Sequence, residues 1–229
     1  MSQPKTGFFN KELAYQYDDK NSRLKPISEC LHFLMGAILK DLPEVGRVLS
    51  VGAGTGSEIL TLARLFPKWT FVAVDPAAPM LEVCIEKFEK AGILERCTLI
   101  EGYVHDVKEK EFDVVVSLLA GHFVKRDDRQ GFYQGMSERL RQGGYFVNAE
   151  ISYDLNSPDF PFMLKNWEEV QKLLGATTES IAMLPKVLKE MLVVLPPQET
   201  EDYIRRSGIK SPIRFFQAFM ICGWYGIRS

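Results

Sequence analysis

Short apolar runs alternate along this chain with segments whose apolar residues recur at helical spacing. The runs, each predicted to be a buried strand, cover residues 48–51, 71–75, 97–100, 112–119 and 145–151. Helical patterns cover residues 28–39, 59–66, 79–91 and 126–141, and Gly143 and Gly144 are predicted to close the last of these helices. Strands that alternate with helices pair in parallel through right-handed crossovers, and continuous apolar runs indicate cover on both faces. The pattern therefore predicts an α/β fold with helices on both faces of a mostly parallel sheet.

Residues 155–198 interrupt this alternation after the fifth strand. They contain two helical patterns, 160–174 and 178–193, rich in Met, Phe, Trp and Leu. Such an insert would lie over the carboxyl ends of the strands, as a satellite core, as a lid or as a dimer surface. A short helix over 199–207 and an antiparallel hairpin over 213–227 would complete one domain, residues 1–229, with residues 1–46 as an N-terminal helical cap.

A glycine-rich turn links the first strand to its helix. Gly52, Gly54 and Gly56 alternate with other residues, and a strand–turn–helix unit presents backbone N–H groups to a ligand. The third glycine of a dinucleotide fingerprint would fall at Ser57, which disfavours a nicotinamide oxidoreductase. The Gly-Lys-Ser/Thr ending of a phosphate-binding P-loop does not occur in this sequence.

An acidic residue, Asp75, ends the second predicted strand about 20 residues after the turn, where such folds place a carboxylate on ribose hydroxyls. Pro76 and a helix follow, so Asp75 is also suited to capping that helix. We favour ribose binding, and one carboxylate can do both. Gly52, Asp75, Tyr103 and Ser117 all fall at the carboxyl ends of predicted strands, where ligands of open α/β sheets bind.

Composition narrows the possible functions. The formal net charge of −2 makes nucleic acid an unlikely partner. Four cysteines without C-x-x-C spacing favour free thiols in a reducing compartment, and no His, Asp or Glu group has metal-ligand spacing, so we predict no metal. The first residues do not resemble a signal peptide, and the longest apolar run, 114–124, is too short for a bilayer. We expect a cytoplasmic protein without a membrane span.

Five segments carry a family resemblance: VLSVGAGTG, FVAVD, EGYVHD, FDVVVSLLAGHFV and LRQGGYFVNAEIS. Over residues 47–152 they resemble the class I S-adenosylmethionine-dependent methyltransferases. YQYDDKNSRLKP, the insert and the tail SGIKSPIRFFQAFMICGWYGIRS are similar to the carboxy-S-adenosylmethionine synthases of tRNA wobble-uridine modification and their methyltransferase relatives. The resemblance implies a Rossmann-like, seven-stranded sheet with one antiparallel strand, and S-adenosylmethionine as cofactor.

The resemblance also implies how the cofactor is bound. Its ribose would lie on Asp75, and Tyr17 and Arg23 would close over its methionine carboxylate. The cofactor would lie over the glycine turn, formed by Gly52, Ala53, Gly54 and Gly56. Its adenine would lie among Pro76, Met80, Tyr103 and Val104, and the end of the fourth strand, Ser117 and Leu118, would run beneath its methionine part.

Three positions depart from the family pattern. Ser50 replaces the acid of the first strand, so water or another group must orient the methionine ammonium. Tyr103 replaces an Asp that would bind the adenine amino group. Tyr203 stands where the carboxy-S-adenosylmethionine synthases hold the extra carboxylate with an arginine, and Arg205 and Arg206 are out of register. This favours a methyltransferase, with a carboxy-S-adenosylmethionine synthase or a non-catalytic cofactor-binding subunit as alternatives.

Methyl transfer from a sulfonium is an in-line displacement that depends mainly on alignment. A general base is needed only if the acceptor loses a proton. His122, Glu150 and Tyr153 lie near the carboxyl ends of predicted strands, and His122 is the preferred candidate because it follows the fourth strand and its ordinary pKa suits a base. The aromatic and Met-rich insert favours a small, partly apolar acceptor, and a homodimer through the insert is a further possibility.

Overall fold

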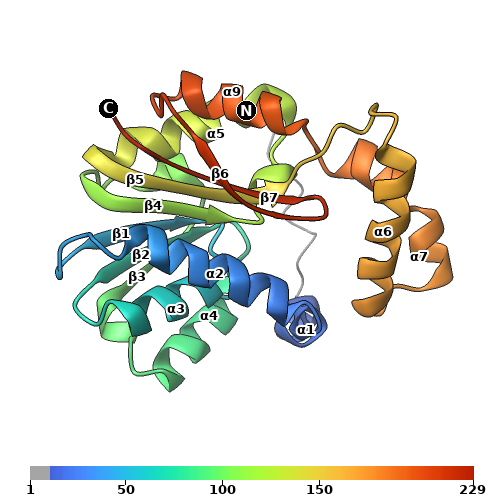
Figure 1. Cartoon of the computed structure of the whole chain (residues 1–229). Helices are drawn as coiled ribbons and strands as arrows, with labels where there is room; N and C mark the ends of the chain where they lie inside the picture. Colours follow the sequence, from blue (N-terminus) through green and yellow to red (C-terminus); the bar gives the residue numbers. More distant parts are fainter. Residues whose placement is uncertain (1–10) are drawn as a thin grey trace.

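The computed structural model describes residues 11–229, and within them the chain forms a seven-stranded sheet of order β3-β2-β1-β4-β5-β7-β6. The strands are β1 (Arg47–Val51), β2 (Thr70–Asp75), β3 (Cys97–Glu101), β4 (Phe112–Leu118), β5 (Leu140–Ile151), β6 (Ile213–Ala218) and β7 (Ile221–Ile227). β1 to β5 are parallel, and β7 runs antiparallel to β5 and β6 (Figure 1). The predicted α/β fold and its C-terminal hairpin are confirmed. The signal-peptide prediction concerns mainly residues 1–10, which lie outside the described residues.

Helices cover both faces of this sheet (Figure 1). One face packs against α2 (Lys25–Leu39), α3 (Ser57–Leu65) and α4 (Ala78–Lys90). The other face packs against α5 (Arg126–Arg139) and α9 (Pro197–Arg206). Alternate residues of one strand enter different cores: Val48 packs with the first set of helices and Leu49 with the second. This double burial explains why the strands read as continuous apolar runs.

The sheet order reverses beside β1, whose neighbours are β2 and β4. The connections after β1 and β4 therefore leave in opposite directions, which opens a crevice at the carboxyl ends of these strands. The N-terminal helix α1 (Lys11–Ser22) lies near this end of the sheet and packs through Ala14 and Tyr17 against α4.

The link between α5 and β5 differs from the prediction. Gly143 and Gly144 were expected to close a helix over 126–141, but α5 ends at Arg139 and both glycines lie inside β5. The register between β4 and β5 slips between Phe112 and Val114. Gly143 has a φ of 72°, which only glycine adopts readily. The glycines therefore mark a bulge in the strand rather than the end of the helix.

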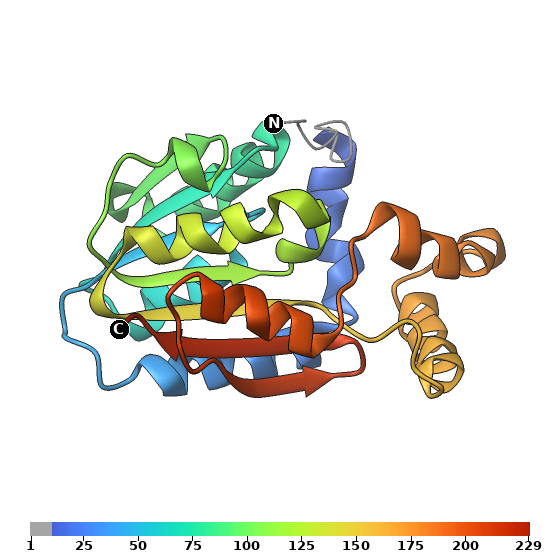
Figure 2. The same ribbon diagram turned by 90° about the horizontal axis from the view of Figure 1, so that it is seen from above.

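The insert begins with α6 (Phe160–Leu173), as predicted, but residues 178–193 do not form one helix. They form α7 (Thr178–Ala182), α8 (Leu184–Lys186) and a π-helical turn, η5 (Val187–Met191). Pro185 has no N–H to continue the hydrogen-bond ladder of a single helix. In both views α6 and α7 project beyond one end of the sheet (Figure 1, Figure 2).

A third apolar cluster attaches the insert to the sheet. Trp167, Val170 and Leu188 of the insert pack with Leu31 of α2 and Met220 beside the hairpin. The insert is thus, in part, the satellite core that the sequence suggested, while the homodimer through it stays a prediction. Across residues 11–229, no helix combines the length and apolarity that crossing a membrane requires.

Candidate functional site

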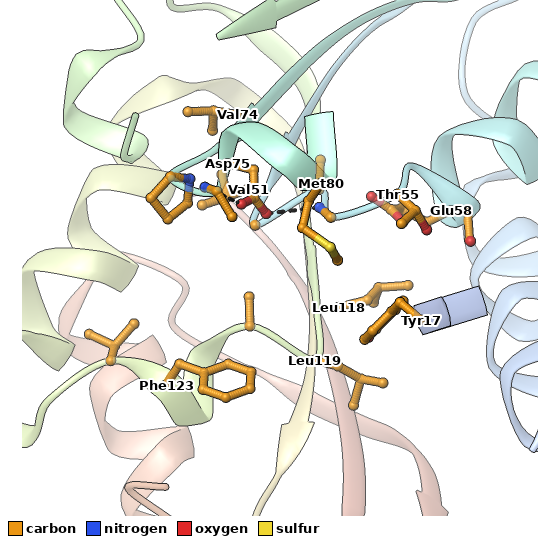
Figure 3. A pocket seen from close by; sticks show the side chains of 18 of the residues that line it. Tyr17, Val51, Thr55, Glu58, Val74, Asp75, Met80, Leu118, Leu119 and Phe123 are labelled. Atoms are coloured by element: carbon orange, nitrogen blue, oxygen red, sulfur yellow. Dashed lines mark hydrogen bonds between the residues drawn. The ribbon is translucent and has the colours of Figure 1, made fainter. Parts of the chain in front are cut away.

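A cavity of about 1810 Å³ opens at the carboxyl ends of β1, β2 and β4. Most of the predicted cofactor-binding residues line it: Tyr17, Gly52, Ala53, Gly54, Asp75, Pro76, Met80, Tyr103, Val104 and Leu118. In Figure 3, Asp75 and Met80 lie across the cavity from Leu119 and Phe123, with Tyr17 beside Leu118. The topology therefore gathers residues from α1, the glycine turn, β2 and β4 at one place.

Several backbone N–H groups of the glycine turn already have hydrogen-bond partners within the protein. The N–H groups of Gly52 and Ala53 donate to the carbonyl of Val74, and that of Gly56 donates to the carbonyl of Ala53. Gly56 does not line the cavity, because it packs against Phe88. The turn thus fixes the shape of the site, and fewer of its amides are available to a ligand than the sequence suggested.

Asp75 holds the turn and the start of α4 together. Its Oδ2 accepts from the N–H of Gly54 and its Oδ1 from the N–H of Ala77, each at 2.8 Å. Only 8% of the residue is exposed, and burial raises the pKa of the carboxyl while the two backbone bonds lower it. Each carboxylate oxygen has a second lone pair, which leaves acceptors for two neighbouring hydroxyls.

The adenine end predicted from the sequence is built by Pro76, Met80, Tyr103 and Val104. The phenol oxygen of Tyr103 is buried without a hydrogen-bond partner in the described residues. Asp106 also lines the cavity and accepts from the N–H of Tyr103 at 2.8 Å. The carboxylate missing at position 103 is therefore present three residues later, on the same loop.

A polar network closes α1 over the turn. Asp18 accepts from the hydroxyl of Thr55 at 2.7 Å and from the Nζ of Lys87 at 2.6 Å. Lys87 also contacts Thr55 and Ser57 at 3.1 and 3.3 Å. These contacts join α1, the turn and α4, which brings Tyr17 to the cavity. Sequence reasoning missed this network because its members are far apart in the chain.

A buried carboxylate, Glu58, lines the cavity beside this network. Its Oε1 accepts from the hydroxyl of Ser50 at 2.5 Å, and 7% of the residue is exposed. Burial raises the pKa of Glu58 to about 7. Sequence reasoning also missed this residue, although an acid in the first turn after a glycine-rich loop was a visible signal.

Besides Gly56, the structure does not bring three predicted residues to the cavity wall. Arg23 donates to the carbonyl of Leu173 in α6, at 3.1 Å. Ser117 is fully buried in β4. His122 is 3% exposed and its Nδ1 accepts from the N–H of Ile151, at 3.3 Å. Burial, and then the charge of Arg129, lower the pKa of His122 to about 3, so its environment is that of a structural hydrogen bonder rather than a general base.

Two other candidates for the base, Glu150 and Tyr153, also do not line the cavity. Glu150 is fully buried in an ion pair with Arg129, with N–O distances of 3.0 and 2.9 Å. Toward the insert the cavity wall includes the apolar residues Leu119, Phe123 and Val193, together with Glu190 of the insert.

The two arginines considered for a carboxylate site lie elsewhere. Arg205 donates to Asp202 and Glu201, at 2.6 and 3.1 Å, and Arg206 stacks over the ring of Tyr203, at 4.6 Å. All five residues belong to α9, and neither arginine lines the cavity. In the part of the chain that the structure describes, no group of three or more His, Cys, Asp or Glu residues is arranged to hold a metal.

Comparison with known proteins agrees with this arrangement. Residues 48–144 match the sequence model of a family described as a methyltransferase domain. A carboxy-S-adenosyl-L-methionine synthase from Nautilia profundicola is 19% identical over 203 residues, 88% of this chain and 86% of the relative. A malonyl-[acyl-carrier protein] O-methyltransferase from Magnetococcus marinus is 33% identical over 110 residues, 48% of this chain and 40% of that enzyme.

Solved structures share the fold. An O-methyltransferase family protein from Burkholderia thailandensis superposes with a TM-score of 0.64 at 12% identity, over 87% of this chain. The chain spans 56% of the length of that protein. The match over residues 48–144, these likenesses and the sheet order support a class I S-adenosylmethionine-dependent methyltransferase, with S-adenosylmethionine as its cofactor.

Proposed function

We propose that the enzyme transfers the methyl group of S-adenosylmethionine in line to a small, partly apolar acceptor. The observation that carries this proposal is the apolar wall formed by Leu119 and Phe123 on the side of the cavity opposite Asp75 and Met80. Val193 of the insert also lines the cavity. Single-ligand pockets usually measure about 300–1000 Å³. The larger cavity found here leaves room for an acceptor beside the cofactor.

The residues present fit the cofactor. The free lone pairs of Asp75 suit the ribose hydroxyls, the buried phenol of Tyr103 lacks a partner among the described residues, and Met80 supplies an apolar surface for adenine. S-adenosylmethionine supplies an electrophilic methyl group. The protein aligns the two reactants and excludes water, which is the main requirement of an in-line displacement. His122 and Glu150 are buried away from the cavity, so we assign neither of them as a general base.

Mass spectrometry tests the proposed reaction. The enzyme is incubated with trideuteromethyl-labelled S-adenosylmethionine and a panel of small acceptors that range from apolar phenols, thiols and amines to multiply charged molecules. We expect S-adenosylhomocysteine and a labelled methyl product from the partly apolar members. Labelling confined to multiply charged acceptors, or to a nucleic acid added as a control, would overturn the proposed acceptor class.

Carboxy-S-adenosylmethionine synthesis is the second candidate function, because similarity to the Nautilia profundicola enzyme extends over 88% of the chain. The placement of Arg205 and Arg206 on α9, away from the cavity, disfavours it. Incubation with S-adenosylmethionine and prephenate separates the two reactions. A product with the mass of carboxy-S-adenosylmethionine would establish the second candidate, and its absence together with methyl transfer would establish the first.

Replacing Asp75 by alanine should weaken S-adenosylmethionine binding about 5- to 150-fold, because hydrogen bonds to a charged group contribute about 1–3 kcal/mol. Isothermal titration calorimetry measures the change, and circular dichroism shows whether the turn that Asp75 supports remains folded. Asp41→Ala, at an exposed position outside the cavity, is the matched control. Unchanged affinity in a folded Asp75→Ala protein would remove Asp75 from the ribose site.

A further inference from the structure

Glu58 is a buried acid at the start of a helix. It is the second residue of α3, directly after the glycine turn, and its carboxylate faces the cavity. The positive end of the helix dipole favours a negative charge at this position. Burial opposes that charge, since moving a carboxylate out of water is costly unless a partner compensates it.

Within the described residues, Glu58 accepts a hydrogen bond from a hydroxyl and belongs to no salt bridge. Ser50 donates to it at 2.5 Å, and no salt bridge within residues 11–229 includes it. Lys87 is a cation whose charge lowers the pKa of Glu58, and Lys87 is already paired with Asp18 at 2.6 Å. A carboxylate in this position is suited to a cation that arrives with the ligand.

The carboxylate of Glu58 lies close to a position where the sequence lacks an expected acid. Ser50 stands in β1 where the resembling enzymes carry the acid that orients the methionine ammonium. The glycine turn folds the chain back, so that Glu58, eight residues later, reaches the hydroxyl of Ser50. The charge missing from the strand is therefore present on the following helix, within hydrogen-bonding distance of the residue that replaced it.

We propose that Glu58, held by Ser50, binds the α-ammonium group of S-adenosylmethionine. This role rests on cofactor binding in the cavity described above. An ammonium group neutralises the buried carboxylate and occupies its second oxygen, while Ser50 fixes the first. Recognition of the methionine part thus comes from the helix, with the strand residue reduced to a positioning role.

Ligands with and without an amino acid part test the assignment. Calorimetry is run on the full chain with S-adenosylhomocysteine, which has the ammonium, and with 5′-methylthioadenosine, which lacks it. Glu58→Gln should weaken S-adenosylhomocysteine binding about 10- to 150-fold and leave 5′-methylthioadenosine within about twofold, since the bond lost is one to a charged group. Glu89→Gln, an exposed change of equal charge on α4, should alter neither affinity.

Moving the acid back to the strand gives a second readout. The double variant Ser50→Asp/Glu58→Gln places a carboxylate at position 50 and a hydrogen-bonding amide at position 58. It should recover most of the affinity for S-adenosylhomocysteine, to within about tenfold of the original protein. Failure of this rescue in a protein that still binds 5′-methylthioadenosine would count against an ammonium site at this pair.

The pH dependence provides a third readout. The pKa of Glu58 is raised to about 7, so acidification from pH 7.5 to 5.5 should weaken S-adenosylhomocysteine binding, by about tenfold per unit once below pH 7. Burial keeps Tyr17 and Cys84 uncharged in this range by raising their pKa values. Asp75, whose pKa is also raised, affects both ligands through their shared ribose. The ratio of the two affinities therefore isolates Glu58.

The possible outcomes are distinguishable. Equal weakening of both ligands by Glu58→Gln would make Glu58 a structural residue and overturn the inference. Unchanged binding of both ligands would do the same, while leaving the cofactor site intact. If the unmodified protein bound neither ligand, the proposed cofactor site itself would fail, independently of Glu58.

Discussion

Replacing Glu150 by glutamine should lower the free energy of unfolding by about 3–5 kcal/mol, because the change leaves the buried charge of Arg129 without its counterion. Both side chains are fully buried, and Arg129 Nη1 lies 3.0 and 2.9 Å from the two oxygens of Glu150. Thr200 donates to the same carboxylate at 3.0 Å, and Arg129 donates to the carbonyl of Val193. Urea denaturation followed by circular dichroism measures the loss.

Two variants show whether the loss comes from the unpaired charge. Glu169→Gln removes one partner of the exposed pair with Lys172 and should change stability by less than about 1 kcal/mol. The double variant Arg129→Met/Glu150→Leu removes both buried charges and should be more stable than Glu150→Gln alone. A double variant less stable than the single one would show that shape, rather than charge compensation, dominates this site.

Replacing Gly56 by alanine should destabilise the protein by about 2–5 kcal/mol. Its φ is 75°, which costs about 1–2 kcal/mol for a residue with a Cβ. The added Cβ would also lie 2.6 Å from the ring of Phe88 and 2.7 Å from Sγ of Cys84, and such overpacking costs about 1–3 kcal/mol.

Gly92→Ala is the matched control for this prediction. Gly92 has a φ of 67°, but a Cβ there would meet nothing within 4 Å. Gly92→Ala should therefore lower the free energy of unfolding only by the cost of a positive φ, about 1–2 kcal/mol. Urea midpoints of the two variants give the comparison, and equal losses would mean that the contact with Phe88 contributes nothing.

The sequence predicted the sheet well because the decisive information is local. Each parallel strand is buried on both faces and so reads as a continuous apolar run, as residues 112–119 do. The glycine turn and Asp75 were also found from local spacing. Gly143 and Gly144 misled the prediction, because a glycine pair after a helix is typical of a helix end and equally of a strand bulge.

Side-chain direction explains the predicted site residues that the structure places elsewhere. Ser117 and Leu118 are adjacent in β4, but successive residues of a strand face opposite sides, and only Leu118 reaches the cavity. His122 follows the same strand, yet its ring is turned into the core. Position at a strand end identified the right loop, and only the folded backbone decides which side chains enter the cavity.

Long-range contacts were beyond sequence reasoning. Asp18, Thr55 and Lys87 meet from three separate elements. Glu58 was overlooked because the helix was identified from the spacing of its apolar residues, which did not draw attention to an acid on its buried side. The loss of the strand acid at Ser50 was visible, but its compensation depends on how the turn folds the chain back toward β1.

The two ends of the insert meet at a single point on the sheet. The N–H of Tyr153 and the hydroxyl of Ser152 both donate to the carbonyl of Leu195, at 2.9 and 2.7 Å. Because the cost of closing such an excursion grows slowly with its length, lengthening or shortening the insert between Ser152 and Leu195 should cost little closure entropy. We therefore expect the length of this segment to be easier to change than the sheet and the glycine turn, which carry the predicted cofactor-binding residues.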